Sequence, residues 1–163
     1  MVYDREKAVE YAVRWAYGRN PQYYDYEKLG GDCTNFVSQC LFAGAGVMNF
    51  APVLGWYYID ANNKSPSWTG VEFLRSFLVR KSGGPGPYAV ETGMAEMEPG
   101  DVIQLSFDGV RFQHSLFVVE TGAKKGRSDI LIASHSDDQL YTSLGTYIYA
   151  KIRFLHILGV NAH

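Results

Sequence analysis

A cysteine stands where a helix is expected to begin, directly after two glycines. Gly30 and Gly31 permit backbone angles that other residues avoid, and Asp32 is a good N-cap residue, so Cys33 would take the first helical position. Unpaired N–H groups and the partial positive charge of a helix start favour a thiolate and lower the pKa of a cysteine. The stretch predicts an activated thiol, but the same place also suits a core thiol, so its neighbours must decide.

Two histidines supply the remaining groups of a nucleophilic site. His114 falls inside an expected strand and His135 at the end of the next one. A cysteine nucleophile needs a base and a third polar group that fixes the tautomer of that base. We expect Cys33 to attack a carbonyl carbon while its backbone N–H helps to hold the oxyanion, and His114 to protonate the leaving amine. The hydroxyl of Tyr26, or Gln22, is a further candidate donor to the oxyanion.

The second cysteine, Cys40, has no glycine turn and only apolar neighbours. It lies on the same expected helix as Cys33, roughly 10 Å away along the axis, which is too far for a disulfide. We therefore expect two free thiols, with Cys40 in the core. Metal coordination is the weaker interpretation of the Cys and His residues, because the ligands would come singly from distant segments. Neither a metal nor an organic cofactor is expected.

Helices are expected to present the cysteine. Hydrophobic spacing predicts an amphipathic helix over Asp4–Gly18, with Asp4 as its cap. The second helix runs from Cys33 to the glycines that follow it, with its apolar residues on one face and Thr34, Asn35 and Ser38 pointing elsewhere. A short helix follows, capped by Ser67 or Thr69, and a glycine-proline loop over residues 83–87 ends it.

An antiparallel sheet is expected to present the histidines. The run 102–107 predicts a strand, and Asp108-Gly109 predicts a two-residue turn into a second strand over 110–120, on which His114 shares a face with the apolar residues. A further strand over 129–134 leads directly into His135, and the segment 146–158 is β-rich. His156 in that segment is expected to be a core or interface histidine.

The chain is rich in aromatic residues, with twelve tyrosines, nine phenylalanines and three tryptophans. The segment 48–68 contains prolines, glycines and asparagines that interrupt any regular pattern, and it is expected to be a loop. Flat rings stack on sugars and peptide backbones, so a substrate groove is one interpretation of this segment, and burial of the rings beneath the loop is the other. The groove candidates are Trp56, Tyr57, Tyr58 and Trp68.

Length and charge narrow the class of protein. The 163 residues predict a single domain, residues 1–163, large enough to fold without disulfide or metal. The net charge of −2 makes nucleic acid an improbable partner, and no apolar stretch approaches the length of a membrane span. The first residues do not resemble a signal peptide, which leaves the cellular compartment open.

Six stretches occur in the order found in a known bacterial family, and together they resemble the bacterial putative amidase domain. Within the wider papain-like group, the chain is similar to NlpC-type and CHAP cell-wall hydrolases, which carry Asp-Cys-Ser-Gly-Phe at the nucleophile. The departure from that pattern is Thr34-Asn35 in place of Ser-Gly. The stretches that carry the resemblance are 31–39, 55–58, 67–71, 99–103, 114–115 and 135–138.

The resemblance implies an α+β fold with a papain-like core. It implies a catalytic triad with Cys33 as nucleophile, His114 as base and His135 as the third polar residue. Asp137 is a less favoured candidate for the third position, and Asp32 is a candidate supporting residue. The implied activity is a cysteine amidase or peptidase that cleaves an amide bond in peptidoglycan or its peptide fragments. A non-catalytic module that binds cell-wall glycan or peptide is the alternative. We expect a monomer, secreted or cell-wall-associated as part of a longer protein, although a cytoplasmic location stays open.

Overall fold

The first helix, α1 (Arg5–Trp15), forms where the sequence predicts it, in a computed structural model that describes all 163 residues. The Asp4 carboxylate accepts a hydrogen bond from the Lys7 backbone N–H at 3.0 Å, which confirms Asp4 as the cap. Ala8 and Ala12 are buried on the face that packs against the second helix. Small side chains on this face allow the two helices to lie close together.

The second helix, α2 (Cys33–Ala45), is buried almost all around. Gly46 ends it with a positive φ of 74°, and its N–H donates to the Phe42 carbonyl. The expectation that Thr34, Asn35 and Ser38 point away from the core is wrong, because all three side chains are buried and hydrogen-bonded within the protein. These polar side chains are tolerated in the core because each one has a hydrogen-bond partner there.

Between α2 and the sheet lies a segment with more regular structure than the sequence suggests. It holds a small hairpin of β1 (Tyr58–Asp60) and β2 (Asn63–Lys64), and then α3 (Pro66–Thr69) and α4 (Val71–Leu78). The predicted caps are wrong, because Gly70 precedes α4 and no side chain caps it. The Ser67 hydroxyl instead donates to the Gly55 carbonyl at 2.6 Å.

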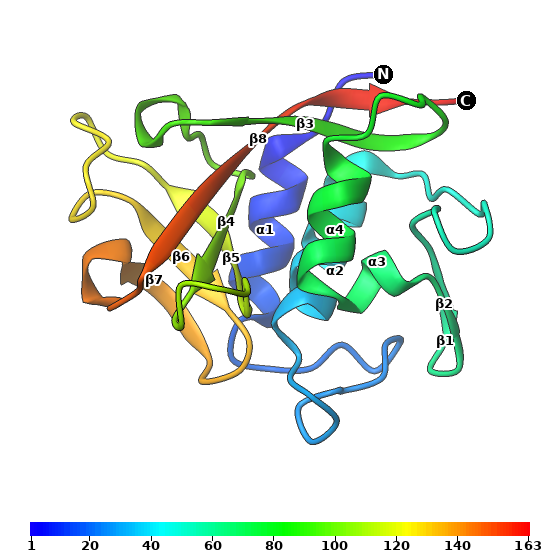
Figure 1. The fold of residues 1–163 in the computed structure, drawn as a ribbon, viewed down its shortest axis with the longest axis horizontal. Helices are drawn as coiled ribbons and strands as arrows, with labels where there is room; N and C mark the ends of the chain where they lie inside the picture. The colour runs from blue at the N-terminus through cyan, green and yellow to red at the C-terminus, as the bar shows by residue number, and fades with distance from the viewer.

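Six strands form one antiparallel sheet in the order β3-β8-β4-β5-β6-β7. Figure 1 shows α1, α2 and α4 grouped beside this sheet, the long β8 crossing it and the two chain ends close together. β3 and β7 are not anticipated from the sequence. The strands are β3 (Gly86–Thr92), β4 (Val102–Ser106), β5 (His114–Glu120), β6 (Leu131–Ser134), β7 (Gln139–Ser143) and β8 (Lys151–Asn161). Two single 3-10 turns, η1 (Met94–Glu96) and η2 (Leu144–Thr146), complete the chain.

The predicted hairpin between β4 and β5 exists, but its two-residue turn does not. Leu105 pairs with His114, and the loop that connects the two strands runs from Phe107 to Gln113, so β5 begins at His114. The Asp108 carboxylate accepts hydrogen bonds from the backbone N–H groups of Val110 and Arg111, which holds the longer loop. The histidine therefore lies at the first position of its strand.

The sheet separates two apolar clusters. The larger, with 23 buried residues, fills the space between helices and sheet and includes Phe117 and Leu155. The smaller, with 9 buried residues, includes Leu116 and Val118 and lies on the opposite face. This division follows the alternation of side chains along each strand. None of the helices combines the length and apolar character needed to cross a membrane.

Candidate active site

Cys33 begins α2 after the expected glycine turn, in which Gly30 and Gly31 have φ values of 98° and 103°. Its side chain is 8% exposed, and its sulfur lies 3.8 Å from Thr34 Oγ1. Burial raises the pKa of the thiol, while the Ser115 backbone N–H and the Thr34 hydroxyl lower it by a smaller amount. The expectation of a lowered thiol pKa is therefore wrong, because burial of Cys33 has the largest effect.

Asp32 precedes the helix but does not cap it with its side chain. One carboxylate oxygen, Oδ1, accepts hydrogen bonds from the Tyr26 backbone N–H at 2.8 Å and from Asn35 Nδ2 at 2.9 Å. The other, Oδ2, lies 2.5 Å from His135 Nδ1. The predicted capping role is therefore wrong, and this buried carboxylate instead joins the glycine turn, α2 and the end of β6.

His135 is held by two acceptors. Its Nδ1 faces Asp32 Oδ2, and its Nε2 lies 2.8 Å from the Trp15 carbonyl oxygen. A carbonyl oxygen only accepts, so Nε2 donates its N–H to the Trp15 carbonyl, while Nδ1 contacts the Asp32 carboxyl group. The ring also stacks on Phe36 at 4.0 Å. Both ring nitrogens of His135 are thus occupied, by Asp32 and by the Trp15 carbonyl, and the residue fastens α1 to α2.

Arg19 closes this buried pair from the outside. Its guanidinium forms two hydrogen bonds with Asp138, at 3.0 and 3.1 Å, and its Nε lies 3.7 Å from Asp32 Oδ2. Asp25 and Glu27 lie within 3.8 Å of the same guanidinium. One arginine therefore holds together the tyrosine-rich connector, the cysteine turn and the turn after β6.

His114 meets a different partner, Ser134. The histidine Nε2 lies 3.1 Å from Ser134 Oγ, and the serine hydroxyl donates to the His135 carbonyl at 2.7 Å. A hydroxyl has a single proton, so Ser134 must accept from His114, whose proton then resides on Nε2. The His114 Nδ1 is left with a free lone pair, which is the form a general base requires.

His114 and His135 are directed to opposite faces of the sheet. The pairing of Phe117 with Ala133 places His135 beside Ser115 on the face toward the helices, and Ser134 beside Leu116 on the other face. The prediction that His135 orients His114 is therefore wrong. Alternation along β6 gives the orienting position to Ser134, which the sequence analysis missed.

The surroundings of His114 keep it neutral. Burial lowers its pKa to about 4, and the charge of Asp137 raises it by a smaller amount. Asp137 is exposed, has a positive φ of 63°, and affects His114 through its charge with no hydrogen bond to it. The rings of Phe107 and Tyr147 lie 6.2 and 6.1 Å from the imidazole. At neutral pH the base form is the resting state.

A hydrogen bond between their neighbours connects Cys33 and His114. Thr34 Oγ1 lies 3.0 Å from Ser115 Oγ, which also accepts from Gln104 Nε2 at 3.2 Å. Since Thr34 follows Cys33 and Ser115 follows His114, this contact fixes the helix start against the strand start. No hydrogen bond joins the thiol to the imidazole directly. The site therefore holds a neutral thiol and a neutral base on two rigid elements.

The predicted aromatic groove is mostly core. Trp56 and Trp68 are 0% exposed, and their indole N–H groups donate to Ser38 Oγ at 3.1 Å and Asn35 Oδ1 at 3.0 Å. Tyr58 is buried as well, and its hydroxyl accepts from the Tyr24 backbone N–H. Burial with satisfied polar groups overturns the groove interpretation for these three rings. Tyr57 is half-buried, with its ring 5.7 Å from that of Phe50.

The hydroxyl of Tyr26 is not an oxyanion donor, because it donates to the Ala61 carbonyl at 2.8 Å. This residue supports the site through its backbone contact with Asp32. Both cysteines are free, and Cys40 is completely buried in the larger core, as predicted. No group of three or more His, Cys, Asp or Glu side chains is arranged to hold a metal ion.

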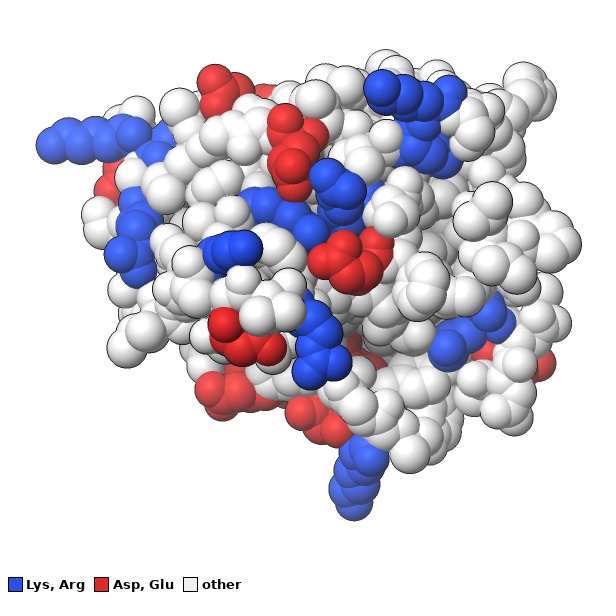
Figure 2. Space-filling view, in the orientation of Figure 1, with Lys and Arg blue, Asp and Glu red and all other residues white.

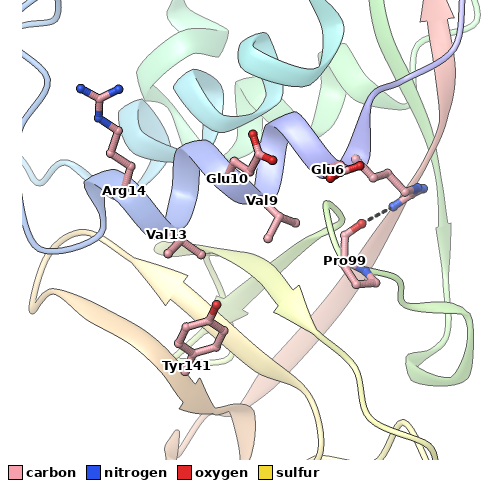
Figure 3. Close-up of a pocket in the computed structure, with 8 residues that line it drawn as sticks. Glu6, Val9, Glu10, Val13, Arg14, Pro99 and Tyr141 are labelled. Atoms are coloured by element: carbon pink, nitrogen blue, oxygen red, sulfur yellow. Dashed lines mark hydrogen bonds between the residues drawn. The ribbon is translucent and has the colours of Figure 1, made fainter.

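A separate groove of about 590 Å³ lies along α1. Figure 3 shows Val9 and Val13 projecting from that helix toward the strand that carries Tyr141. The Arg5 side chain, which also lines the groove, donates to the Pro99 carbonyl at 2.8 Å. None of the residues that line it is a candidate catalytic residue. The cavity is therefore distinct from the Cys33 and His114 site.

Comparison with known proteins identifies the family. The family model described as "Putative amidase domain" matches residues 2–158. The chain belongs to this family. It is also 34% identical, over 140 residues, to the "Uncharacterized protein YhbB" of Bacillus subtilis (strain 168). That match covers 85% of this chain and 43% of the relative, so the chain spans less than half of that protein's length. No solved structure matches.

Proposed function

We propose that this amidase-family domain is a cysteine hydrolase that cleaves an amide bond in peptidoglycan or its peptide fragments. Cys33 is the nucleophile and His114 the base. The observation that carries the proposal is the neutral His114, whose Nε2 proton is held by Ser134 while the adjacent Ser115 is bonded to Thr34, beside the thiol. The family match supports amide chemistry, and the cysteine mechanism is our inference from the site.

The first half of the reaction forms a thioester. As the substrate carbonyl approaches, the Cys33 thiol gives its proton to His114 Nδ1, and the sulfur attacks the carbonyl carbon. The Cys33 backbone N–H is a donor for the oxyanion, because it lies at the helix start and has no helical partner. The carbon–nitrogen bond then breaks, and His114 passes its proton to the leaving amine.

The second half regenerates the enzyme. A water molecule gives a proton to His114 Nδ1 and attacks the thioester carbonyl, the carbon–sulfur bond breaks, and His114 returns the proton to the sulfur. The products are a carboxylic acid and the amine released earlier. An amine in place of water would transfer the acyl group through the same residues.

Ser134 acts in this mechanism as a positioning residue. Its hydroxyl accepts the Nε2 proton of His114 and is itself oriented by the His135 carbonyl. The neutral serine does for the tautomer what a carboxylate does in other triads, without stabilising the imidazolium as strongly. His135 and Asp32 contribute by holding that carbonyl and the cysteine turn in place.

A papain-like core is the scaffold we propose for this chemistry. A nucleophile at the start of a buried helix, packed on an antiparallel sheet that carries the histidine, supports this assignment. The order of the sequence stretches that resemble NlpC-type and CHAP hydrolases supports it as well. We also propose that the domain acts at the cell wall as part of a longer protein, in keeping with the greater length of its relative.

The binding-module alternative loses its main motivation. It depends on an exposed aromatic surface, and Trp56, Tyr58 and Trp68 are buried. Tyr57 alone is a weak platform for a glycan. The hydrolase therefore accounts better for the residues that face the site.

Digestion of purified peptidoglycan, with mass spectrometry of the soluble fragments, tests the proposal. The wild-type domain should release fragments with new carboxyl and amino termini, which name the bond that is cut. Cys33→Ala should release none, while the matched variant Cys40→Ala should digest at the wild-type rate once its folding is verified by circular dichroism. Equal digestion by Cys33→Ala and the wild type would overturn the cysteine mechanism.

A further inference from the structure

A cationic pocket lies at the far end of a row of polar residues that begins beside the nucleophile. Gln104 pairs with Ser115 on one side and with Arg153 on the other, so the three residues occupy one row across β5, β4 and β8. Side-chain contacts follow this row, from Thr34 to Ser115 at 3.0 Å, to Gln104 at 3.2 Å, and to Arg153 Nε at 2.8 Å. Neighbouring strands lie about 4.8 Å apart, which places Arg153 roughly 10 Å from Ser115.

The pocket at Arg153 has a volume of about 680 Å³. Arg75 from α4 and Lys151 from β8 line it together with Arg153, and Glu91 is its single acidic lining residue. Figure 2 shows basic and acidic side chains interspersed in the middle of the face where β8 passes α4. We call this cavity, with its lining residues Arg75, Glu91, Phe112, Lys151 and Arg153, the arginine pocket.

Arg153 is fixed in this pocket by the protein. Its side chain is 10% exposed, its Nη1 lies 3.0 Å from Glu72 Oε1, and its guanidinium carbon lies 3.9 Å from the centre of the Phe112 ring. The side chain of Arg153 is already held in one conformation without a ligand, so less conformational entropy is lost when a ligand binds.

Two donors in the arginine pocket have no partner. Three buried side-chain nitrogen or oxygen atoms in the chain lack a hydrogen bond, and two of them are Arg153 Nη2 and Arg75 Nε. A buried donor without an acceptor is costly, so such atoms call for an explanation. The carboxylates nearby do not supply the missing acceptors, because Glu72 contacts Nη1 and the Arg75–Glu91 contact is a long 3.5 Å.

The charges in the pocket are also incompletely balanced. Burial lowers the pKa of Arg153, the charges of Glu72 and Glu91 raise it, and the charge of Arg75 lowers it, so the two guanidinium groups repel each other. Three cations face two carboxylates when Glu72 is included. An added anion would relieve that repulsion and supply the missing acceptors.

We propose that the arginine pocket binds a carboxylate of an acidic peptide substrate, and so selects amides that carry a negative charge away from the bond cleaved at Cys33. The carboxylate accepts from Arg75 and Arg153 while Lys151 adds long-range attraction. This inference depends on the proposed function for its substrate, but binding of an acidic peptide can be measured without turnover.

The kinetic test compares two peptide amides that differ only by Glu or Gln at one position. The wild-type domain should prefer the Glu peptide by about tenfold in kcat/KM, as expected for charge-assisted hydrogen bonds. The double variant Arg75→Gln/Lys151→Gln should lose this preference, because its kcat/KM for the Glu peptide should fall to its kcat/KM for the Gln peptide. The control Lys7→Gln/Lys81→Gln removes the same charge from residues outside the pocket and should keep the preference. An equal preference in both double variants would overturn the proposal.

The binding test uses the Cys33→Ala protein and follows the arginine Nε–H signals by NMR during titration with the same two peptides. The Glu peptide should shift the signals of Arg75 and Arg153 at concentrations where the Gln peptide does not. Shifts without turnover in the wild type would support the pocket and contradict the proposed hydrolase. Turnover with neither shifts nor a Glu preference would contradict the pocket alone.

Discussion

Thr34 Oγ1 and Ser115 Oγ lie 3.0 Å apart, and this contact joins the residue after the nucleophile to the residue after the base. Both side chains are buried, so removal of either hydroxyl leaves the other without its hydrogen bond, which water cannot replace. The contact therefore serves both to stabilise the fold and to align the site. These two effects can be separated by mutation.

Thr34→Val keeps the shape of the side chain and removes its hydroxyl. We expect a loss of about 1–3 kcal/mol in the free energy of unfolding and a fall in kcat, because α2 loses its polar link to β5. Urea denaturation of the two single variants Thr34→Val and Ser115→Ala, and of the double variant, measures the coupling between them. Strictly additive effects on stability would mean that the contact contributes nothing.

His135→Gln tests the structural role assigned to that residue. The change removes the partner of the buried Asp32 carboxylate, so we expect a loss of about 3–5 kcal/mol in the free energy of unfolding. His135 lies on the face of the sheet opposite His114. The acidic side of the pH profile of kcat/KM, which reports the pKa of His114, should therefore stay where it is in the wild type. A shift of the acidic side of this pH profile in a folded His135→Gln protein would show that His135 does orient His114.

Ser134→Ala gives the complementary result. The tautomer of His114 would no longer be fixed, so we expect kcat to fall by about ten- to a hundredfold with little change in KM. Ser134→Thr, which retains a hydroxyl, should recover part of the lost rate. The assignment fails if Ser134→Ala turns over at the wild-type rate.

The buried His114 predicts a pH dependence of stability. Its folded pKa of about 4 lies below its ordinary value of 6.5, so between these values the unfolded chain binds more protons. The contribution to stability is complete above pH 6.5 and declines as the pH falls toward 4, by about 3 kcal/mol. The free energy of unfolding, measured by denaturation at several pH values in this range, should therefore change more steeply with pH for the wild type than for His114→Asn. Equal slopes in the two proteins would refute the assignment.

Asp137→Asn tests the charge beside the base. The carboxylate raises the pKa of His114, so its removal should lower that pKa and move the acid limb of kcat/KM to lower pH. Asp138→Asn, in the same turn but bonded to Arg19, serves as the matched control and should move the limb less. A shift to higher pH in Asp137→Asn would contradict the electrostatics described here.

Much of the site could be anticipated because local chemistry determines it. The positive φ values of Gly30 and Gly31 follow from the residue type, as does the helix that presents Cys33. The strand that carries His114 and its antiparallel partner also follow from the alternation of apolar and polar residues along the chain. What local patterns do not give is the partner across the sheet. Ser134 and His135 are adjacent in sequence, and only the register of β6 against β5 decides which one meets His114.

Burial explains the other errors. Thr34, Asn35 and Ser38 are polar in sequence, but each has a specific partner inside the protein, from Ser115 to the two indoles. The same pairing holds Trp56 and Trp68 in the core, which decides between the two interpretations of these rings, a groove or burial, that the sequence leaves open. Burial of Cys33 raises the pKa of its thiol, whereas the local sequence pattern predicts a lowered one. Such pairings depend on tertiary structure and leave no periodic signal.

The most direct test of the account is the mass of the trapped intermediate. A slowly hydrolysed amide or ester substrate, quenched in acid during turnover, should add the acyl mass to the protein, and peptide mapping should locate it on Cys33. The adduct should be absent in Cys33→Ala and present in Cys40→Ala, which retains the nucleophile. Undiminished turnover by a folded Cys33→Ala protein, with no adduct on Cys33 in the wild type, would contradict the central claim.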